Sequence, residues 1–151
     1  MKKMSRRLAL FVAATAGFAP AAHAAVQKEH RVVFQIDESD PKVMNQVLNN
    51  VANLMEYYHS NAEQVQVEVV AYGPGLNMLR EDKSPVKDRI AHLKSESFPS
   101  SVAFSACGNT KKGMEKAEGH LVTIIPQATV VPAGVVRLTE LQEQGWSYLR
   151  P

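Results

Sequence analysis

Segments typical of buried strands alternate along the chain with segments typical of amphipathic helices, and this alternation limits the fold more than any other feature. The strand-like segments are short and cover residues 30–37, 64–72, 101–106, 128–131 and 146–150. The first two are rich in β-branched residues, and the last is expected to be an edge strand. Strands that are joined through helices run parallel, and the connecting helices cover both faces of their sheet. We therefore expect an α/β fold with a mainly parallel sheet of about five strands.

The residues that precede the first two predicted helices support these boundaries. Asp40 stands where an N-cap is expected, and Pro41 follows it at the first helical position. Apolar residues then recur at helical spacing as far as Tyr58. Ser84 and Pro85 repeat the same arrangement, so a second helix is predicted to start there.

Two shorter helices are predicted in the second half of the chain. One follows the strand at 101–106 and starts with Asn109 or Thr110 as its N-cap. The other runs from residue 132 or 133 to residue 144 and ends at Gly145. The sequence shows no internal repeat and no linker, so residues 25–151 are expected to form a single domain.

The first 24 residues have the pattern of a cleavable secretion signal. Four cations at positions 2, 3, 6 and 7 precede an apolar run over residues 8–19, and Ala22-His23-Ala24 then offers small residues for cleavage. The apolar run is too short to cross the roughly 30 Å hydrocarbon core of a membrane. We expect residues 1–24 to be removed, leaving a periplasmic or otherwise exported protein without a membrane anchor.

Removal of the signal changes the charge of the domain that remains. Four of the seventeen Lys and Arg residues lie within residues 1–24, whereas all fifteen Asp and Glu residues lie after them. The formal charge therefore falls from +2 to −2. A mildly acidic domain offers no general basic surface, so we expect neither nucleic acid nor an anionic membrane as a partner.

Cys107 is the only cysteine of the chain, so no disulfide can form within it. It stands between a predicted strand and a predicted helix, at the strand end where α/β sheets bind ligands. The amides and dipole of a helix N-terminus stabilise a thiolate, and Lys111 and Lys112 could add to that effect. Position alone leaves two interpretations open, a reactive thiol or a small buried apolar residue.

Several residues of the predicted loops could surround this thiol. Because parallel strands end at one edge of a sheet, glycines in the loops after residues 72 and 131 would border the same edge as Cys107. The candidates for lining a pocket or stabilising an anion are Gly73, Gly75, Gly108, Asn109, Thr110 and Gly134. Turn formation and helix capping are the simpler interpretation of these residues. Arg137 could direct a cation there, although a solvated position on the helix surface is favoured.

Other kinds of chemistry have no recognisable pattern in the sequence. His30, His59, His92 and His120 are scattered, and none has metal-ligand spacing with Cys107 or a hydrolase motif around it. The acidic residues lie in segments dense with charge, so no acid/base pair stands out. No phosphate loop or dinucleotide fingerprint is present. We therefore expect no metal and no cofactor.

Four segments give the chain a more specific character when they are taken together in order. They are Val32-Val-Phe-Gln-Ile36, Val69-Val-Ala-Tyr-Gly-Pro-Gly75, Phe104-Ser-Ala-Cys-Gly-Asn-Thr110, and the C-terminal Val130-Val-Pro-Ala-Gly through Gly145-Trp-Ser-Tyr-Leu-Arg-Pro151. In these segments the sequence resembles the DsrE/DsrF-like family, which includes sulfur carriers and sulfurtransferase subunits. The resemblance implies a flavodoxin-like three-layer subunit that commonly oligomerises. It also implies that Cys107 is the sulfur-accepting residue and carries a persulfide.

Two functions are consistent with these observations. The first is an exported thiol-based sulfur carrier or sulfurtransferase-like protein that uses Cys107 and exchanges sulfur with a donor or acceptor protein. The second is a non-enzymatic envelope protein for ligand binding or assembly, with Cys107 as a structural residue. In either case we expect a homo-oligomer, because Trp146, Tyr148 and Leu149 form an apolar edge segment that could pair with another subunit.

Overall fold

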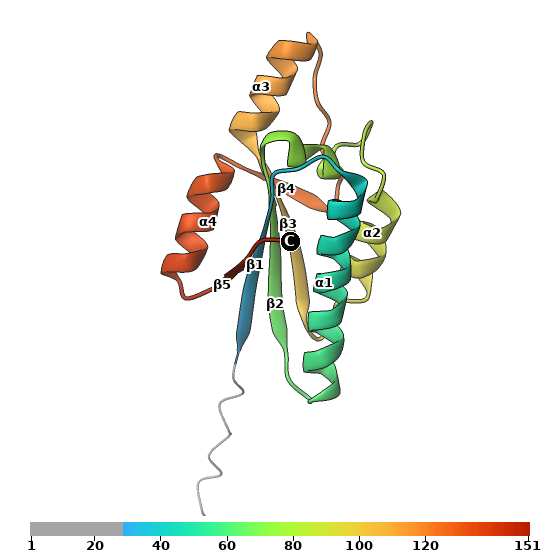
Figure 1. Cartoon of the computed structure of the whole chain (residues 1–151), viewed down its shortest axis with the longest axis vertical. Helices are drawn as coiled ribbons and strands as arrows, with labels where there is room; N and C mark the ends of the chain where they lie inside the picture. The colour runs from blue at the N-terminus through green and yellow to red at the C-terminus, as the bar shows by residue number, and fades with distance from the viewer. Residues whose placement is uncertain (1–28) are drawn as a thin grey trace, which may run out of the picture.

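The computed structural model describes residues 29–151, so the predicted secretion signal lies outside the described residues. Within residues 29–151, strands and helices alternate as expected (Figure 1). Their bounds in chain order are β1 His30–Ile36, α1 Pro41–Ser60, β2 Val65–Ala71, the 3-10 helix η1 Gly73–Leu79, α2 Lys87–Ser95, β3 Ser101–Cys107, α3 Gly108–Glu118, β4 Ala128–Val131, α4 Gly134–Glu143 and β5 Ser147–Leu149.

The five strands form one sheet in the order β4-β3-β2-β1-β5, and every neighbouring pair is parallel. This confirms the predicted α/β fold of the flavodoxin-like kind. The strand order differs from the 2-1-3-4-5 order of flavodoxin itself. Here β1 to β4 are added in one direction, and the chain then returns past β1 to add β5 on the other side.

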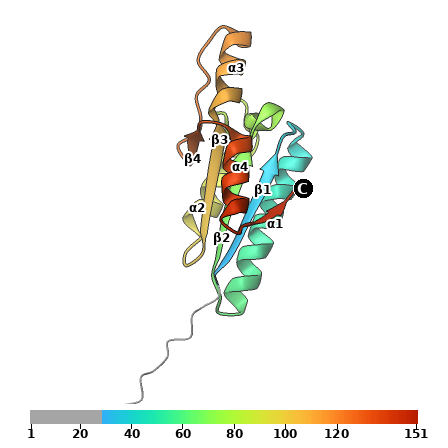
Figure 2. The same cartoon turned by 90° about the vertical axis from the view of Figure 1, so that its left-hand side faces the viewer.

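This return connection places α4 on the opposite face of the sheet from α1 and α2 (Figures 1 and 2). Side chains that alternate along each strand divide between the two faces. On β1, Phe34 packs in the larger core beneath α1 and α2, whereas Val33 packs in the smaller core beneath α4. The sheet is therefore the middle one of three layers.

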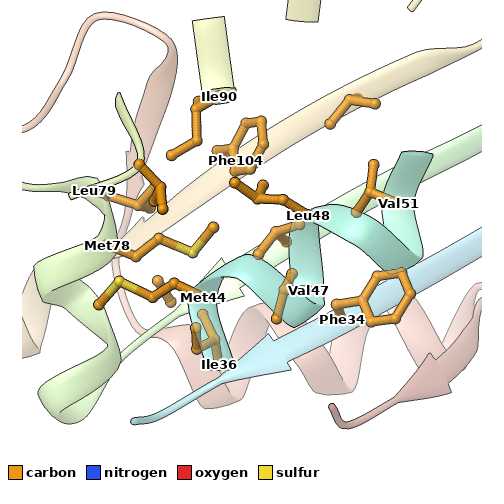
Figure 3. Close-up of a cluster of buried hydrophobic side chains, with 14 of the residues drawn as sticks. Phe34, Ile36, Met44, Val47, Leu48, Val51, Met78, Leu79, Ile90 and Phe104 are labelled. Carbon is orange, nitrogen blue, oxygen red and sulfur yellow. The ribbon is translucent and has the colours of Figure 1, made fainter. Parts of the chain in front are cut away.

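The larger core is almost entirely apolar. Figure 3 shows side chains from β1, β3, α1, η1 and α2 converging on one cluster between the sheet and its helices. Labelled members are Phe34, Ile36, Met44, Val47, Leu48, Val51, Met78, Leu79, Ile90 and Phe104. The apolar stripe of α1, read from the sequence at helical spacing, lies against the sheet because that contact removes it from water.

The start of α1 is as predicted, and the start of α2 is not. The Asp40 carboxylate accepts a hydrogen bond from the Lys42 N–H at 2.8 Å, and Pro41 begins the helix. The second helix begins at Lys87, later than the predicted start at Ser84 and Pro85. The Ser84 hydroxyl instead accepts from the Val86 N–H at 3.3 Å, which forms a turn ahead of the helix.

The residues after β2 form a 3-10 helix where the sequence predicted only a sharp turn. Gly73 has a positive φ of 52°, which favours glycine. A Cβ atom at Gly75 would lie 2.3 Å from the carbonyl oxygen of Ile36, so only glycine allows η1 to approach β1 this closely. Gly75 is therefore explained by packing against β1.

Helix α3 extends from the carboxyl end of the sheet and projects beyond it (Figures 1 and 2). Arg80, which is fully buried, holds its far end. The Arg80 guanidinium donates to both carboxylate oxygens of Glu118 at 2.6 and 2.8 Å and to those of Asp82 at 2.9 and 2.7 Å. This double ion pair fixes the C-terminal turn of α3 to the segment that follows η1.

Candidate functional site

Cys107 is the last residue of β3 and the N-cap of α3. Its Sγ atom accepts a hydrogen bond from the Thr110 N–H at 3.4 Å. The expectation that Asn109 or Thr110 would cap this helix is therefore wrong. The sulfur takes the place that a Ser or Asp oxygen commonly has at an N-cap, and the helix starts directly at Gly108.

Thr110 joins the start of α3 to the loop after β2. Its hydroxyl oxygen accepts a hydrogen bond from the Gly73 N–H at 2.9 Å. Gly73 and Thr110 are thus brought together at the carboxyl edge of the sheet, beside Cys107. The bond between them connects η1 to α3.

The loop after β4 approaches Cys107 from the other side. A Cβ atom added at Gly134 would lie 3.3 Å from the Cβ of Cys107 and 3.0 Å from the Cβ of Tyr72. Gly134 is the first residue of α4, so a second helix N-terminus faces the thiol. The sequence predicted that Gly134 borders the same sheet edge as Cys107, and the structure places the first residue of α4 directly against the cysteine side chain.

The first two residues of α3 pack against the end of β4. A Cβ atom at Gly108 would lie 2.9 Å from the carbonyl oxygen of Val131, and the Asn109 N–H donates to the carbonyl of Pro132 at 3.2 Å. The glycine is required by this close approach. The backbone of Asn109 is mainly engaged in holding two loops together.

The Cys107 side chain is only 5% exposed, and burial by itself raises the pKa of its thiol. Hydrogen bonds from the side chain and backbone of Thr110 and from the backbone of Gly134 and Asn109 outweigh that effect, so the pKa lies below its ordinary value. Lys111, which was expected to contribute, forms an ion pair with Glu115 instead. The acidity of the thiol comes mainly from hydrogen bonds supplied by the two helix starts.

A partly buried ion pair lies under α4 on the same face of the sheet as Cys107. Arg137 donates from Nε and Nη2 to the two carboxylate oxygens of Glu68 at 2.8 and 2.7 Å, and the Ser105 hydroxyl donates to Glu68 at 2.6 Å. Glu68 is 3% exposed. The favoured interpretation of Arg137 as a solvated surface residue is therefore wrong.

Glu68 and Ser105 were missed in the sequence, although Glu68 carried a detectable signal. It lies among valines in a strand that is buried on both faces, where an isolated carboxylate would be costly without a cation. That cost predicts a cationic partner. The sequence could not show that the partner is Arg137, which is 69 residues away.

A small hollow of about 200 Å³ adjoins this region at the start of α4. It is lined by Val131, Pro132, Ala133, Val136, Arg137 and Glu140. Val131 pairs in register with Cys107 across the β3–β4 ladder, so the hollow borders the strand end that carries the thiol.

The histidines lie apart from Cys107 where their contacts are defined. His30, at the start of β1, stacks on Tyr58 at 3.9 Å and bonds to Glu63, at the opposite end of the sheet from the thiol. Among residues 29–151, no three His, Cys, Asp or Glu side chains are grouped so that they could hold a metal ion. In the same part of the chain, no helix is both long and apolar enough to span a membrane.

No family model and no curated protein matches the chain. A solved structure does: MTH1491, a protein of unknown function from Methanobacterium thermoautotrophicum, is 36% identical, with a TM-score of 0.65. The match covers 81% of this chain and 99% of that one. The chain belongs to the same family as MTH1491. Membership in the MTH1491 family supports the α/β fold, while the chemistry of Cys107 has to be argued from its own surroundings.

Proposed function

We propose that this protein is an exported thiol-based sulfur carrier or sulfurtransferase-like protein of the DsrE/DsrF-like type, with Cys107 as its persulfide site. The observation that carries the proposal is the hydrogen bond from the Thr110 N–H to the Cys107 sulfur at the N-terminus of α3. Together with Gly134 and Asn109, it favours a thiolate in a position that burial alone would disfavour.

Sulfur transfer through such a thiolate needs no cofactor. The Cys107 thiolate attacks the outer sulfur of a donor persulfide, R–S–SH. The new S–S bond forms on Cys107 while the donor S–S bond breaks, and its electron pair leaves with the donor as a thiolate. The products are Cys107–S–SH and R–S⁻, with no net oxidation. An acceptor thiolate then attacks the outer sulfur and releases Cys107 as a thiolate.

The surroundings of Cys107 are suited both to its thiolate and to its persulfide anion. A persulfide that loses its proton carries its charge on the outer sulfur, one bond farther from the sheet. The partial positive charges of the α3 and α4 N-termini act on a negative charge at the Cys107 sulfur and also on one at the outer persulfide sulfur. The site thus favours an anionic sulfur before and after transfer.

The proposed partners are a sulfur donor or acceptor protein and further copies of this chain. The predicted signal at residues 1–24 supports a periplasmic or otherwise exported location for both. A subset of the exposed apolar side chains lies near the carboxyl edge and on the β5 edge of the sheet, and this subset supports assembly. It includes Val130, Val135, Val136, Tyr148 and Leu149.

A second candidate function is favoured by the same burial. A thiol that is 5% exposed and caps a helix also fits a non-enzymatic ligand-binding or assembly protein in which Cys107 is structural. The two candidates differ in what they expect of the thiol at neutral pH. A carrier has a thiolate that reacts, whereas a structural cysteine is inert.

The pH dependence of Cys107 alkylation in the folded protein separates the two functions. The sulfur-carrier proposal expects a rate that has already risen near neutral pH, because the thiol pKa lies below its ordinary value. A thiol that reacts only after unfolding, or only at the pH of an unperturbed cysteine, would overturn the proposal.

A further inference from the structure

The Glu68–Arg137 ion pair is placed where it can fix the helix start that faces Cys107. Arg137 lies in the first turn of α4, since its N–H donates to the Ala133 carbonyl at 3.0 Å. Gly134, at the start of the same turn, lies so close to Cys107 and Tyr72 that an added Cβ would meet their side chains at 3.3 and 3.0 Å. The guanidinium then reaches down to Glu68 in β2, the central strand. The ion pair therefore ties the first turn of α4 to the middle of the sheet.

Ser105 connects the same carboxylate to the strand that carries the thiol. It lies two residues before Cys107 on β3 and faces the α4 side of the sheet, where its hydroxyl donates to Glu68 at 2.6 Å. Glu68 thus accepts from β3 and from α4 at once. This one carboxylate therefore links α4 to β3.

We propose that Glu68 and Arg137 are positioning residues, whose ion pair holds the first turn of α4 against the Cys107 side chain. The inference rests on the proposed function only in giving this contact a task in sulfur transfer. Neither residue contacts the reacting sulfur. Their effect passes through the backbone of α4.

An apolar contact would hold α4 equally well if the task were only stability. Burying the Glu68 carboxylate costs desolvation energy, and well-packed apolar pairs of similar volume are often at least as stable as buried ion pairs. The bidentate geometry does something that apolar packing does not, because two parallel hydrogen bonds fix both the distance and the rotation of the helix turn. That directional control fixes where the first turn of α4 meets Cys107.

The charged and titratable groups near Cys107 come from three directions. Tyr72 precedes η1, Lys111 and Lys112 lie in the first turn of α3, and the Glu68–Arg137 pair lies beneath α4. Burial and the nearby Asp37 raise the Tyr72 pKa, so Tyr72 stays neutral where thiols titrate. If substitution of Glu68 or Arg137 shifts the pH dependence of alkylation, the shift therefore reports a change in the pKa of Cys107.

The test compares alkylation profiles of the full purified protein and its variants. Arg137→Lys keeps the positive charge but loses the bidentate geometry, and E68Q/R137M removes both charges together without altering the net charge. We expect both variants to alkylate about fivefold more slowly at neutral pH, with profiles moved to higher pH, as loss of one well-placed hydrogen bond predicts.

A matched control is Arg89→Lys on the other side of the sheet. Arg89 of α2 donates to Asn45 and Asn49 of α1, so the same substitution loosens a comparable helix contact far from the thiol. Its Cys107 profile should stay that of the wild type, even if the melting temperature falls. Should Arg137→Lys fail to fold, the charge-neutral double variant decides.

Two outcomes separate this inference from the proposed function. Wild-type profiles in the folded double variant would overturn the positioning role, as would an equal shift in Arg89→Lys. A shifted profile in a protein whose wild type takes up no sulfur from a persulfide donor would uphold the positioning role and refute the carrier function. Sulfur uptake that is equal in the wild type and both pair variants, with equal profiles, would refute the positioning role alone.

Discussion

The Sγ atom of Cys107 lies 3.4 Å from the backbone nitrogen of Thr110, so the only thiol of the chain is also the cap of α3. One atom thereby has two roles. As a cap it satisfies an amide that would otherwise lack a partner at the helix start. As a thiol it is stabilised in its anionic form by that same amide, so the structural contact and the proposed chemistry depend on each other.

Substitution of Cys107 tests the capping role separately from the chemistry. Cys107→Ser keeps an acceptor at the cap, whereas Cys107→Ala removes it. We expect the alanine variant to be less stable than the serine variant by about 0.5–2 kcal/mol, the usual range for loss of an N-cap. Urea unfolding measures the difference. Equal stability of the two variants would show that the sulfur does not cap α3.

Gly134 is expected to tolerate no side chain. In Gly134→Ala the new Cβ would meet Tyr72 at 3.0 Å and Cys107 at 3.3 Å, which forces the start of α4 away from the thiol. We expect a loss of about 1–3 kcal/mol in unfolding free energy and slower alkylation of Cys107. Gly113→Ala is the matched control, because its new Cβ would meet no atom within 4 Å.

Gly113 lies inside α3, where alanine favours the helix by about 0.5–1 kcal/mol over glycine. The control should therefore be somewhat more stable than the wild type and should alkylate at the same rate. If Gly134→Ala were equally well tolerated, the close contact between α4 and Cys107 would be wrong.

The ion pair between Arg80 and Glu118 makes stability depend on pH. Hydrogen bonds from Arg80 and then Lys83 lower the Glu118 pKa to about 2. A lowered carboxyl pKa contributes stability above its ordinary value and loses it as the pH falls toward about 2. We expect Glu118→Gln to be less stable than the wild type at neutral pH, with the difference closing at acid pH in chemical unfolding.

Glu143→Gln is the control for the acid titration, because Glu143 is an exposed residue at the end of α4. It should follow the wild-type curve throughout. A Glu118→Gln curve parallel to that of the wild type down to strong acid would show that the pair with Arg80 contributes nothing to the pH dependence.

Assembly through the β5 edge is tested by comparing substitutions of two exposed leucines, one on β5 and one outside it. Leu149 in β5 is 43% exposed at the edge of the sheet, and Leu121, after α3, is 83% exposed. We expect the wild type to be a homo-oligomer in light scattering at micromolar concentration, and Leu149→Glu to lower its mass. Leu121→Glu should leave the mass unchanged. A monomeric wild type would refute assembly.

The sequence predicted the parts of the fold that depend on local patterns. Valine-rich strands, the Asp40–Pro41 helix start and the loops at the carboxyl edge all follow from short-range rules, and the structure has them. It also pointed to Cys107 as the residue at the end of β3. The secretion signal and the sulfur chemistry stay predictions.

The remaining features depend on contacts between distant segments. The pairing of Glu68 with Arg137 arises because the chain crosses back from β4 to β5. Local patterns do not determine which face of a sheet such a crossing covers, and so do not show which strand residue a helix cation will meet. The error over the cap of α3 has a different origin, since cysteine is not among the usual N-cap residues.

The most direct test of the sulfur-carrier account is the intact mass of the folded protein after treatment with a small persulfide donor. The account predicts a gain of one sulfur atom, with release of one donor thiolate per chain and full reversal by a thiol acceptor. Cys107→Ser should gain nothing. An unchanged wild-type mass, or the same gain in Cys107→Ser, would contradict the assignment of Cys107 as a persulfide site.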